Sequence, residues 1–86
     1  MSKEINDLSA DELYILIGKN VARLRKKANL SQLDLSLEMG NKSTSLISSA
    51  ELYTKKRKFN IAQLQKIAKI LDIDICEFFK PIEKVK

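Results

Sequence analysis

Apolar residues recur at every third or fourth position along most of this chain, a spacing that places them on one side of an α-helix. The longest such series is Leu13, Ile17, Val21, Leu24 and Ala28. Ser9 stands before it and Glu12 follows three residues later, a pair of residue types that caps the start of a helix reciprocally. We therefore expect a first helix from Ser9 to about Ala28, ended by Asn29 in a left-handed conformation.

A second, shorter helix is predicted between Ser31 and Gly40. The Ser31 hydroxyl can cap its first amides, the helix dipole favours Asp34 in its first turn, and Gly40 can take the positive φ that ends it. Two apolar pairs lie one turn apart in this segment, Leu35 with Met39 and Leu33 with Leu37. The first pair is expected to face the core, so the helix is either buried on two sides or exposes the second pair.

The third predicted helix follows a polar turn at residues 41–43 and runs from about Thr44 to Leu52. Its apolar anchors are Leu46, Ile47 and Ala50. Most of its other positions carry hydroxyl groups, which can face solvent or a polar partner.

Two more helices are predicted in the last third of the chain. Asn60 and Gln63 form a capping pair before a helix that is expected to bury one apolar side. That side consists of Ile61, Leu64, Ile67, Ala68 and Leu71. Asp74 and Glu77 repeat the capping pattern before a last short helix over residues 75–80.

These elements predict an all-α fold, a compact bundle of five helices. With 86 residues the chain is long enough for one small domain, and we expect its core over residues 9–80 and frayed ends. Two glycines and one proline are too few turn-forming residues for a β-rich fold.

The residue types that carry most enzyme and metal chemistry are scarce. Histidine, the usual general base and commonest metal ligand, is absent, and the single Cys76 cannot form an internal disulfide. We therefore expect no enzyme activity, no metal and no cofactor, and Cys76 as a small buried apolar group, with a redox switch as the alternative. No apolar run is long enough to cross a bilayer and no secretory signal is present, which predicts a soluble, cytoplasmic protein without a membrane partner.

Charge is unevenly distributed along the chain, although its formal total is only +5. Residues 1–12 sum to −3, whereas residues 13–30 carry only positive groups, Lys19, Arg23, Arg25, Lys26 and Lys27. A second cluster consists of Lys55, Lys56, Arg57 and Lys58. Two basic clusters indicate a polyanionic partner, although lysine runs can also serve only to solvate a small protein.

Several short motifs follow one another in a characteristic order along residues 17–80. Their residues are Ile17, Gly18, Leu24, Arg25, Leu30, Ser31, Gln32, Leu35, Met39, Gly40, Ile47, Ser48, Glu51, Leu64, Ile67, Ala68, Leu71, Phe78 and Phe79. In order and spacing they resemble the Cro/C1 repressor type of helix-turn-helix domain, a lambda-repressor-like bundle of five helices, with the motif at about residues 31–52. The chain departs from the family in having one extra residue between Gly40 and Ile47, Tyr53 where glycine is common, and Ser36 where alanine is usual.

The resemblance implies a DNA-binding site. Gln32 would hydrogen-bond a phosphate at the start of the first motif helix, where free amides add to the attraction. Bases would be read by the turn and the exposed side of the third helix, at Asn41, Lys42, Ser43, Thr44, Ser45, Ser48 and Ser49. Phosphates would also be met by Lys55, Lys56, Arg57 and Lys58. Arg25 and Glu51 match a family pair that bridges the first and third helices. Each of these roles has an alternative. Gln32 would only start a helix, and the hydroxyl residues would form a polar loop without a groove contact. The lysine-rich cluster would only be solvated, and Arg25 and Glu51 would be two independent surface charges.

The function that follows is sequence-specific binding of double-stranded DNA by a transcriptional regulator, with repression as the expected mode. One domain covers one half-site, so we expect a homodimer on a pseudo-palindromic operator. Its expected dimer interface is Ile73, Ile75, Phe78 and Phe79. No small-molecule effector is expected. The alternative is a protein-interaction module that keeps the fold and docks a partner, antitoxin-like, through Leu33 and Leu37. Three biological contexts fit such a short chain of this type: a phage repressor, an antitoxin and a restriction-modification controller.

Overall fold

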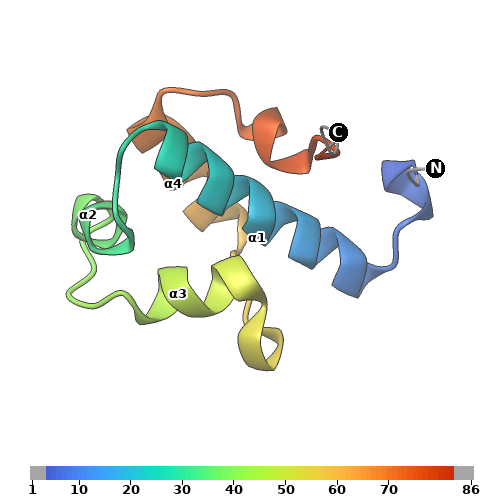
Figure 1. Cartoon of the computed structure of the whole chain (residues 1–86), viewed down its shortest axis with the longest axis horizontal. Helices are drawn as coiled ribbons and strands as arrows, with labels where there is room; N and C mark the ends of the chain where they lie inside the picture. The colour runs from blue at the N-terminus through green and yellow to red at the C-terminus, as the bar shows by residue number, and fades with distance from the viewer. Residues whose placement is uncertain (1–3, 83–86) are drawn as a thin grey trace.

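The computed structural model describes residues 4–82, and in this part of the chain all regular secondary structure is helical (Figure 1). The elements in chain order are the 3-10 helix η1 (Ile5–Asp7), α1 (Ala10–Lys27), α2 (Gln32–Glu38), α3 (Ser45–Leu52), the 3-10 helix η2 (Thr54–Lys56), α4 (Ile61–Leu71) and the 3-10 helix η3 (Ile75–Phe79). The all-α prediction is therefore confirmed. Within residues 4–82, none of these helices has the length and apolar character needed to cross a bilayer.

The predicted starts of three α-helices are confirmed by reciprocal caps. The pairs are Ser9 with Glu12, Ser31 with Asp34, and Asn60 with Gln63. In each pair the first side chain accepts a hydrogen bond from a backbone N–H inside the helix, and the second side chain accepts one from the capping residue. Two amides that the helix cannot satisfy are thereby bonded, which stabilises each start by about 1 kcal/mol.

Each α-helix is followed by a residue with a left-handed backbone. The φ angles are 61° at Asn29, 86° at Gly40, 55° at Tyr53 and 56° at Asp72. The first two were predicted. After α2, the amide of Asn41 donates to the Ser36 carbonyl at 2.9 Å, which closes the turn that leads to α3.

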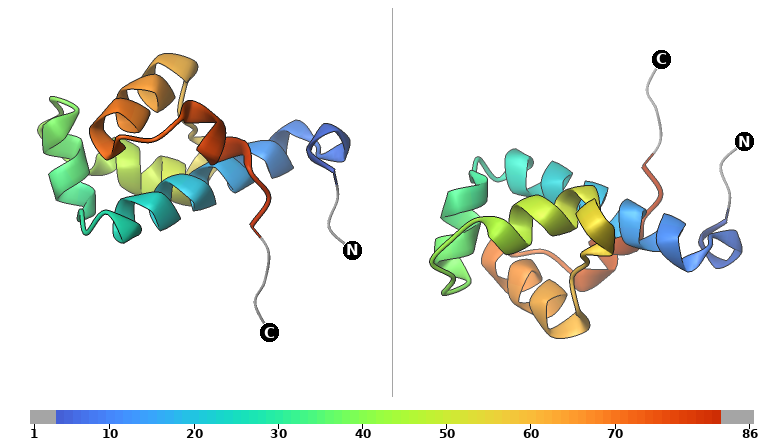
Figure 2. Two further views of the ribbon diagram at one scale, coloured as in Figure 1. Left: turned by 90° about the horizontal axis from the view of Figure 1, so that it is seen from above. Right: turned by 90° about the horizontal axis from the view of Figure 1, so that it is seen from below.

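The long helix α1 organises the fold, with α3 packed on one side of it and η3 on another, while α4 contacts η3 and α2 (Figures 1 and 2). The enclosed core consists of Ile17, Val21, Leu24, Leu35, Met39, Ile47, Ala50, Phe59, Leu64, Ile67, Ala68 and Phe78. At the crossing of α1 and α3, Gly18 lets the two backbones meet: a Cβ built there would lie 2.6 Å from the Ala50 carbonyl oxygen. No larger residue fits at this point.

The fifth predicted helix is not an α-helix, so the bundle has four α-helices in residues 4–82. Asp74 caps the amide of Cys76 at 2.9 Å, and the segment that follows is the short 3-10 helix η3. The fully buried Asn20 of α1 holds this segment by donating from its Nδ2 to the carbonyl oxygens of Phe78 and Lys80, both at 2.8 Å. The tighter turn leaves Cys76 exposed, so the prediction of a buried cysteine is wrong.

The outer side of α2 is exposed, which decides between the two possibilities left open by its double apolar pattern. Leu35 and Met39 are buried as predicted, whereas Leu33 and Leu37 are 49% and 58% exposed. Ile61 was expected in the core but is exposed, because it lies in the first turn of α4 at the edge of a surface hollow.

Ser36 is fully buried in α2, and its hydroxyl has no hydrogen-bond partner among the described residues. An unsatisfied buried hydroxyl destabilises the folded state. We therefore expect Ser36→Ala to raise the free energy of unfolding by about 1–3 kcal/mol in urea denaturation. Ser49→Ala in α3 is the control for the higher helix propensity of alanine, worth at most about 0.5 kcal/mol. Equal effects of the two substitutions would show that the hydroxyl at Ser36 carries no penalty.

Candidate nucleic-acid interface

The turn before α3 and the outer side of α3 form a polar ridge, which we call the hydroxyl ridge. It consists of Lys42, Ser43, Thr44, Ser45, Ser48 and Ser49. On the opposite side of α3, Ile47 and Ala50 are buried against the core. In Figure 1 α3 runs along the lower edge of the molecule, with the side away from α1 open to solvent. The ridge is therefore presented outward by the burial of the helix's other side.

Short-range hydrogen bonds order part of this ridge. The Ser43 hydroxyl accepts from the Ser45 amide at 3.4 Å and donates to the Ser45 hydroxyl at 3.2 Å. The Ser48 hydroxyl donates to the Ser45 carbonyl at 3.3 Å. Hydroxyl oxygens keep spare lone pairs in such arrangements, so they can still contact a ligand.

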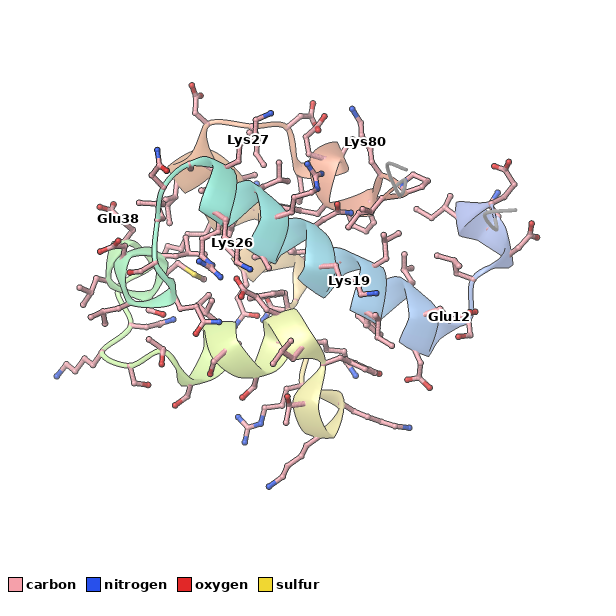
Figure 3. All side chains as sticks on the ribbon, in the orientation of Figure 1. Glu12, Lys19, Lys26, Lys27, Glu38 and Lys80 are labelled. Carbon is pink, nitrogen blue, oxygen red and sulfur yellow. The ribbon has the colours of Figure 1, made fainter. Side chains whose placement is uncertain are left out.

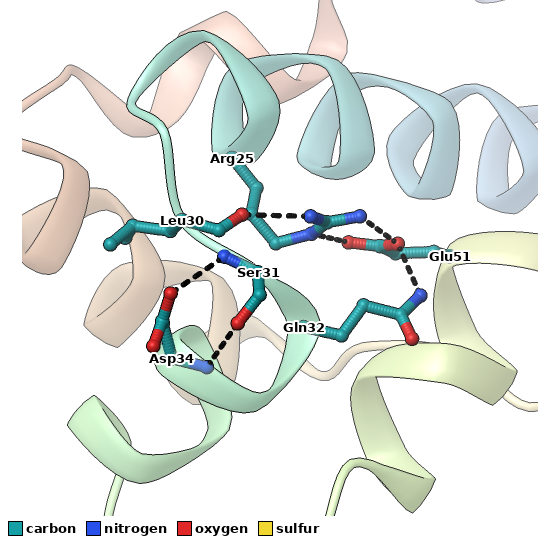
Figure 4. A network of polar contacts seen from close by, with 6 residues as sticks. All are labelled: Arg25, Leu30, Ser31, Gln32, Asp34 and Glu51. Atoms are coloured by element: carbon teal, nitrogen blue, oxygen red, sulfur yellow. Dashed lines mark hydrogen bonds and ion pairs between the residues drawn. The ribbon is translucent and has the colours of Figure 1, made fainter.

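A buried ion pair fixes the direction of α3 (Figure 4). Arg25 of α1 donates from Nε to one Glu51 carboxylate oxygen at 2.7 Å and from Nη2 to the other at 3.0 Å. Its Nη1 donates to the Leu30 carbonyl at 2.8 Å. Both side chains are nearly inaccessible to solvent. The structure thus brings Arg25 and Glu51 together in a bidentate pair that joins α1, the start of α2 and the end of α3.

Gln32 takes part in the same network. Its Nε2 donates to a Glu51 carboxylate oxygen at 3.0 Å, and since a carboxylate only accepts, the amide group must point this way. One N–H of the amide remains available. Gln32 therefore already links α2 to α3 without any ligand, a contact that the sequence pattern did not indicate.

The four cations at residues 55–58 do not form one surface. Arg57 borders the same shallow polar hollow as Lys42 and Ser43 of the hydroxyl ridge. The Lys58 Nζ instead lies 4.8 Å from the centre of the Tyr14 ring on α1, a cation–π contact. The two side chains diverge because Arg57 has an extended backbone, with φ of −74° and ψ of 138°, in which successive side chains point to opposite sides.

Tyr53 anchors this basic segment to α1. Its hydroxyl donates to an Asp11 carboxylate oxygen at 2.6 Å, and its ring stacks on Tyr14 with 5.9 Å between centroids. The hydrogen bond to Asp11 raises the pKa of Tyr53 to about 12, because ionisation would remove the donor and face the carboxylate with a like charge. Tyr53 stands where the family commonly has glycine, and these two contacts offset the cost of its left-handed backbone.

The exposure of two further residues, Phe78 and Leu52, differs from what a surface and a core position would suggest from the sequence. Phe78 is fully buried in the core, so its prediction as part of a dimer interface is wrong; Ile73, Ile75 and Phe79 are half-buried against the core. Leu52, at the end of α3, is 78% exposed. It follows Ser45 by seven residues and therefore lies on the same side of the helix, a signal that helical periodicity could have revealed.

Acidic groups are too dispersed to suggest a metal centre. No group of three metal-ligating side chains occurs in the part of the chain that is described. Asp34 and Asp74 are instead used as helix caps, and the backbone N–H groups of Ser31 and Cys76 that they accept from lower the pKa of each carboxyl group.

Comparison with known proteins supports this arrangement at the level of the family. A family model described as helix-turn-helix matches residues 21–78, from the middle of α1 to η3. No curated protein matches the chain. The matched segment contains the hydroxyl ridge, the Arg25–Glu51 pair and the basic segment.

Proposed function

The chain belongs to the Cro/C1-type helix-turn-helix family of DNA-binding regulators, and from this we propose that it binds double-stranded DNA sequence-specifically and represses transcription as a homodimer. The observation that carries this proposal is the hydroxyl ridge, a polar surface in which Lys42 is the one charged member, with Arg57 at the hollow that Lys42 also borders. An α-helix with such a surface fits the major groove, with cations beside it for the phosphates.

In this arrangement α3 enters the major groove. Ser45, Ser48 and Ser49 face base edges, and Thr44 and Ser43 lie at the entrance to the groove. A hydroxyl can donate to or accept from several bases, so each contact discriminates less than a bidentate arginine would. The exposed Leu52 offers an apolar surface suited to a thymine methyl group. Sequence-dependent DNA shape would supply part of the specificity.

Phosphate contacts would come from two places. At the start of α2, Gln32 can donate its remaining N–H beside the free amides of the helix. On the other side of α3, Lys55, Lys56 and Arg57 would meet the backbone, whereas Lys58 is directed to Tyr14. These contacts position α3 and supply affinity rather than specificity.

The test of this function is selection of bound sequences from random duplex DNA at near-physiological salt. A two-fold dimer predicts a pseudo-palindromic site whose half-sites are centred about 34 Å apart, one turn of the duplex. Binding there would occlude a promoter. Recovery of no sequence above the starting pool would contradict the proposal.

The two neighbouring cations at residues 57 and 58 give a matched pair of variants. We expect Arg57→Ala to reduce the slope of log affinity against log salt by about 0.9, the value for one lost phosphate contact. Lys58→Ala should leave the slope unchanged, because that ammonium group lies over Tyr14. Titration of the selected site at several salt concentrations measures both, and equal slopes for both variants and the unchanged protein would place the basic segment away from DNA.

A second candidate function is docking of a protein partner. The exposed pair Leu33 and Leu37 on α2 favours it, since two large apolar side chains one turn apart form a patch that a partner can cover. It predicts no salt-dependent binding to any duplex, which the same titration would reveal.

A further inference from the structure

The segment before α1, together with the first turn of α1, is acidic, whereas the second half of α1 is basic. Over residues 4–12 the charged side chains are all acidic, at Glu4, Asp7, Asp11 and Glu12. Over residues 19–27 they are all basic, at Lys19, Arg23, Arg25, Lys26 and Lys27. Figure 3 shows Glu12, Lys19 and Lys26 following one another along the helix. The segment made of η1 and α1 therefore has an acidic end and a basic end, with an extended link at Leu8 and Ser9 between the two helices.

Three of the basic charges lie on the side of α1 that faces away from the molecule. The buried residues of α1 are Ile17, Gly18, Asn20, Val21, Leu24 and Arg25. Lys19, Arg23 and Lys26 are exposed and are spaced by four and three residues, on the opposite side of the helix. We call this the outer side of α1. It is separate from α3, which crosses α1 at Gly18 and Arg25.

An apolar hollow lies on the same outer side, between the acidic and basic ends. It is lined by Ile5, Leu8, Ile15, Leu16, Pro81 and Ile82, with Glu12 and Lys19 at its border. Ile15 and Ile82 are each 39% exposed. Apolar side chains surrounded by charges are the arrangement expected of a protein interface with an apolar centre and a polar rim.

We propose that the outer side of α1 is the homodimer interface, and that it docks the same side of a second copy in antiparallel orientation. In an isologous two-fold contact centred on the hollow, the acidic end of one copy, with Glu4 and Asp7, lies opposite the basic end of the other, with Arg23 and Lys26. The pattern is therefore self-complementary, as a two-fold interface requires. A parallel arrangement would place like charges together and is disfavoured.

Charge complementarity selects a second copy over other occupants. Each chain carries a net charge of +5, so two copies repel unless their acidic segments are matched with basic ones. A second DNA duplex would be attracted by the basic half but repelled by the acidic residues at the other end of the same surface. The apolar hollow would supply affinity, while the charged rim would set the register.

This interface rests on the dimeric regulator proposed above and deepens it by naming the dimer surface. It replaces the η3 surface, where Phe78 is needed in the core. Because α3 lies on a different side of α1, the hydroxyl ridge stays uncovered in the dimer.

The experiment is a charge exchange measured by sedimentation equilibrium without DNA, at low and near-physiological salt. One variant carries Glu4→Lys with Asp7→Lys, and the other carries Arg23→Glu with Lys26→Glu. Each alone is expected to dimerise about tenfold or more weakly than the unchanged chain, because like charges then face each other. An equal mixture of the two is expected to regain dimers, since every pair is complementary again.

Lys55→Glu with Lys69→Glu is a control that changes the net charge as much as Arg23→Glu with Lys26→Glu does, but on other surfaces, and it should keep the affinity of the unchanged chain. Rescue in the mixture also shows that both variants are folded. This matters because Arg23→Glu removes the hydrogen bond that Arg23 donates to the Asn20 side chain at 3.1 Å. An unchanged chain that sediments as a monomer, or a mixture that dimerises no better than its parts, overturns the interface. Since DNA is absent, such a failure is distinct from a failure to select a DNA site.

Discussion

Gly18→Ala is expected to lower the free energy of unfolding by about 1–3 kcal/mol, although the same change inside an ordinary helix raises it by about 0.5–1 kcal/mol. A Cβ at this position would lie 2.6 Å from the Ala50 carbonyl oxygen and 2.7 Å from that of Glu51. Both atoms belong to the backbone of α3, so no side chain can move aside. The methyl group would have to push α3 away from α1, and the hydroxyl ridge would move with it.

Urea denaturation measures the loss of stability, and amide NMR shifts in α3 report its displacement. Ala22→Gly in the same helix is the control, because it changes helix propensity alone in the opposite direction. DNA affinity should fall as well, since Glu51 moves with α3. A Gly18→Ala protein that is as stable as the unchanged chain, with unshifted α3 signals, would contradict the close contact of the two helices.

Helix starts in this chain could be predicted because their causes are local. A hydroxyl or amide at one position and an acid or amide three residues on, as at Ser9 and Asn60, bond within a single turn and need no other part of the fold. Asn20 could not be recognised in this way. Its partners lie 58 and 60 residues away, and only the folded chain places the carbonyls of Phe78 and Lys80 beside it.

The same distinction holds for the candidate site. Which residues lie on the outer side of α3 follows from helical periodicity, so the serines of the hydroxyl ridge could be predicted. The directions of Arg57 and Lys58 could not, because a run of four cations carries no periodic signal and it is the extended backbone at Arg57 that sends the two side chains to opposite sides. The prediction placed Phe78 and Phe79 together in a dimer interface. Adjacent residues of a 3-10 helix point in different directions, however, and Phe78 is the one that reaches the core.

Glu51→Ala is expected to lower the free energy of unfolding by about 3–5 kcal/mol, the loss found when one partner of a buried ion pair is removed. The substitution leaves the buried Arg25 guanidinium with only the Leu30 carbonyl and also removes the acceptor of Gln32. A small domain has a total stability of roughly 5–15 kcal/mol, so this one change takes a large part of it. Thermal or urea unfolding at neutral pH measures the effect.

The double variant Arg25→Ala with Glu51→Ala separates a coupled pair from two independent charges. Because the second substitution removes the unpaired buried charge left by the first, we expect the double variant to be less destabilised than the sum of the single variants, by about 1–3 kcal/mol. Strictly additive losses would mean that the two side chains act separately. Glu51→Gln keeps the shape and one acceptor oxygen and should fall between the unchanged chain and Glu51→Ala. If α3 depends on this pair for its direction, DNA affinity should follow the same order among the variants, measured at a temperature where all of them are folded.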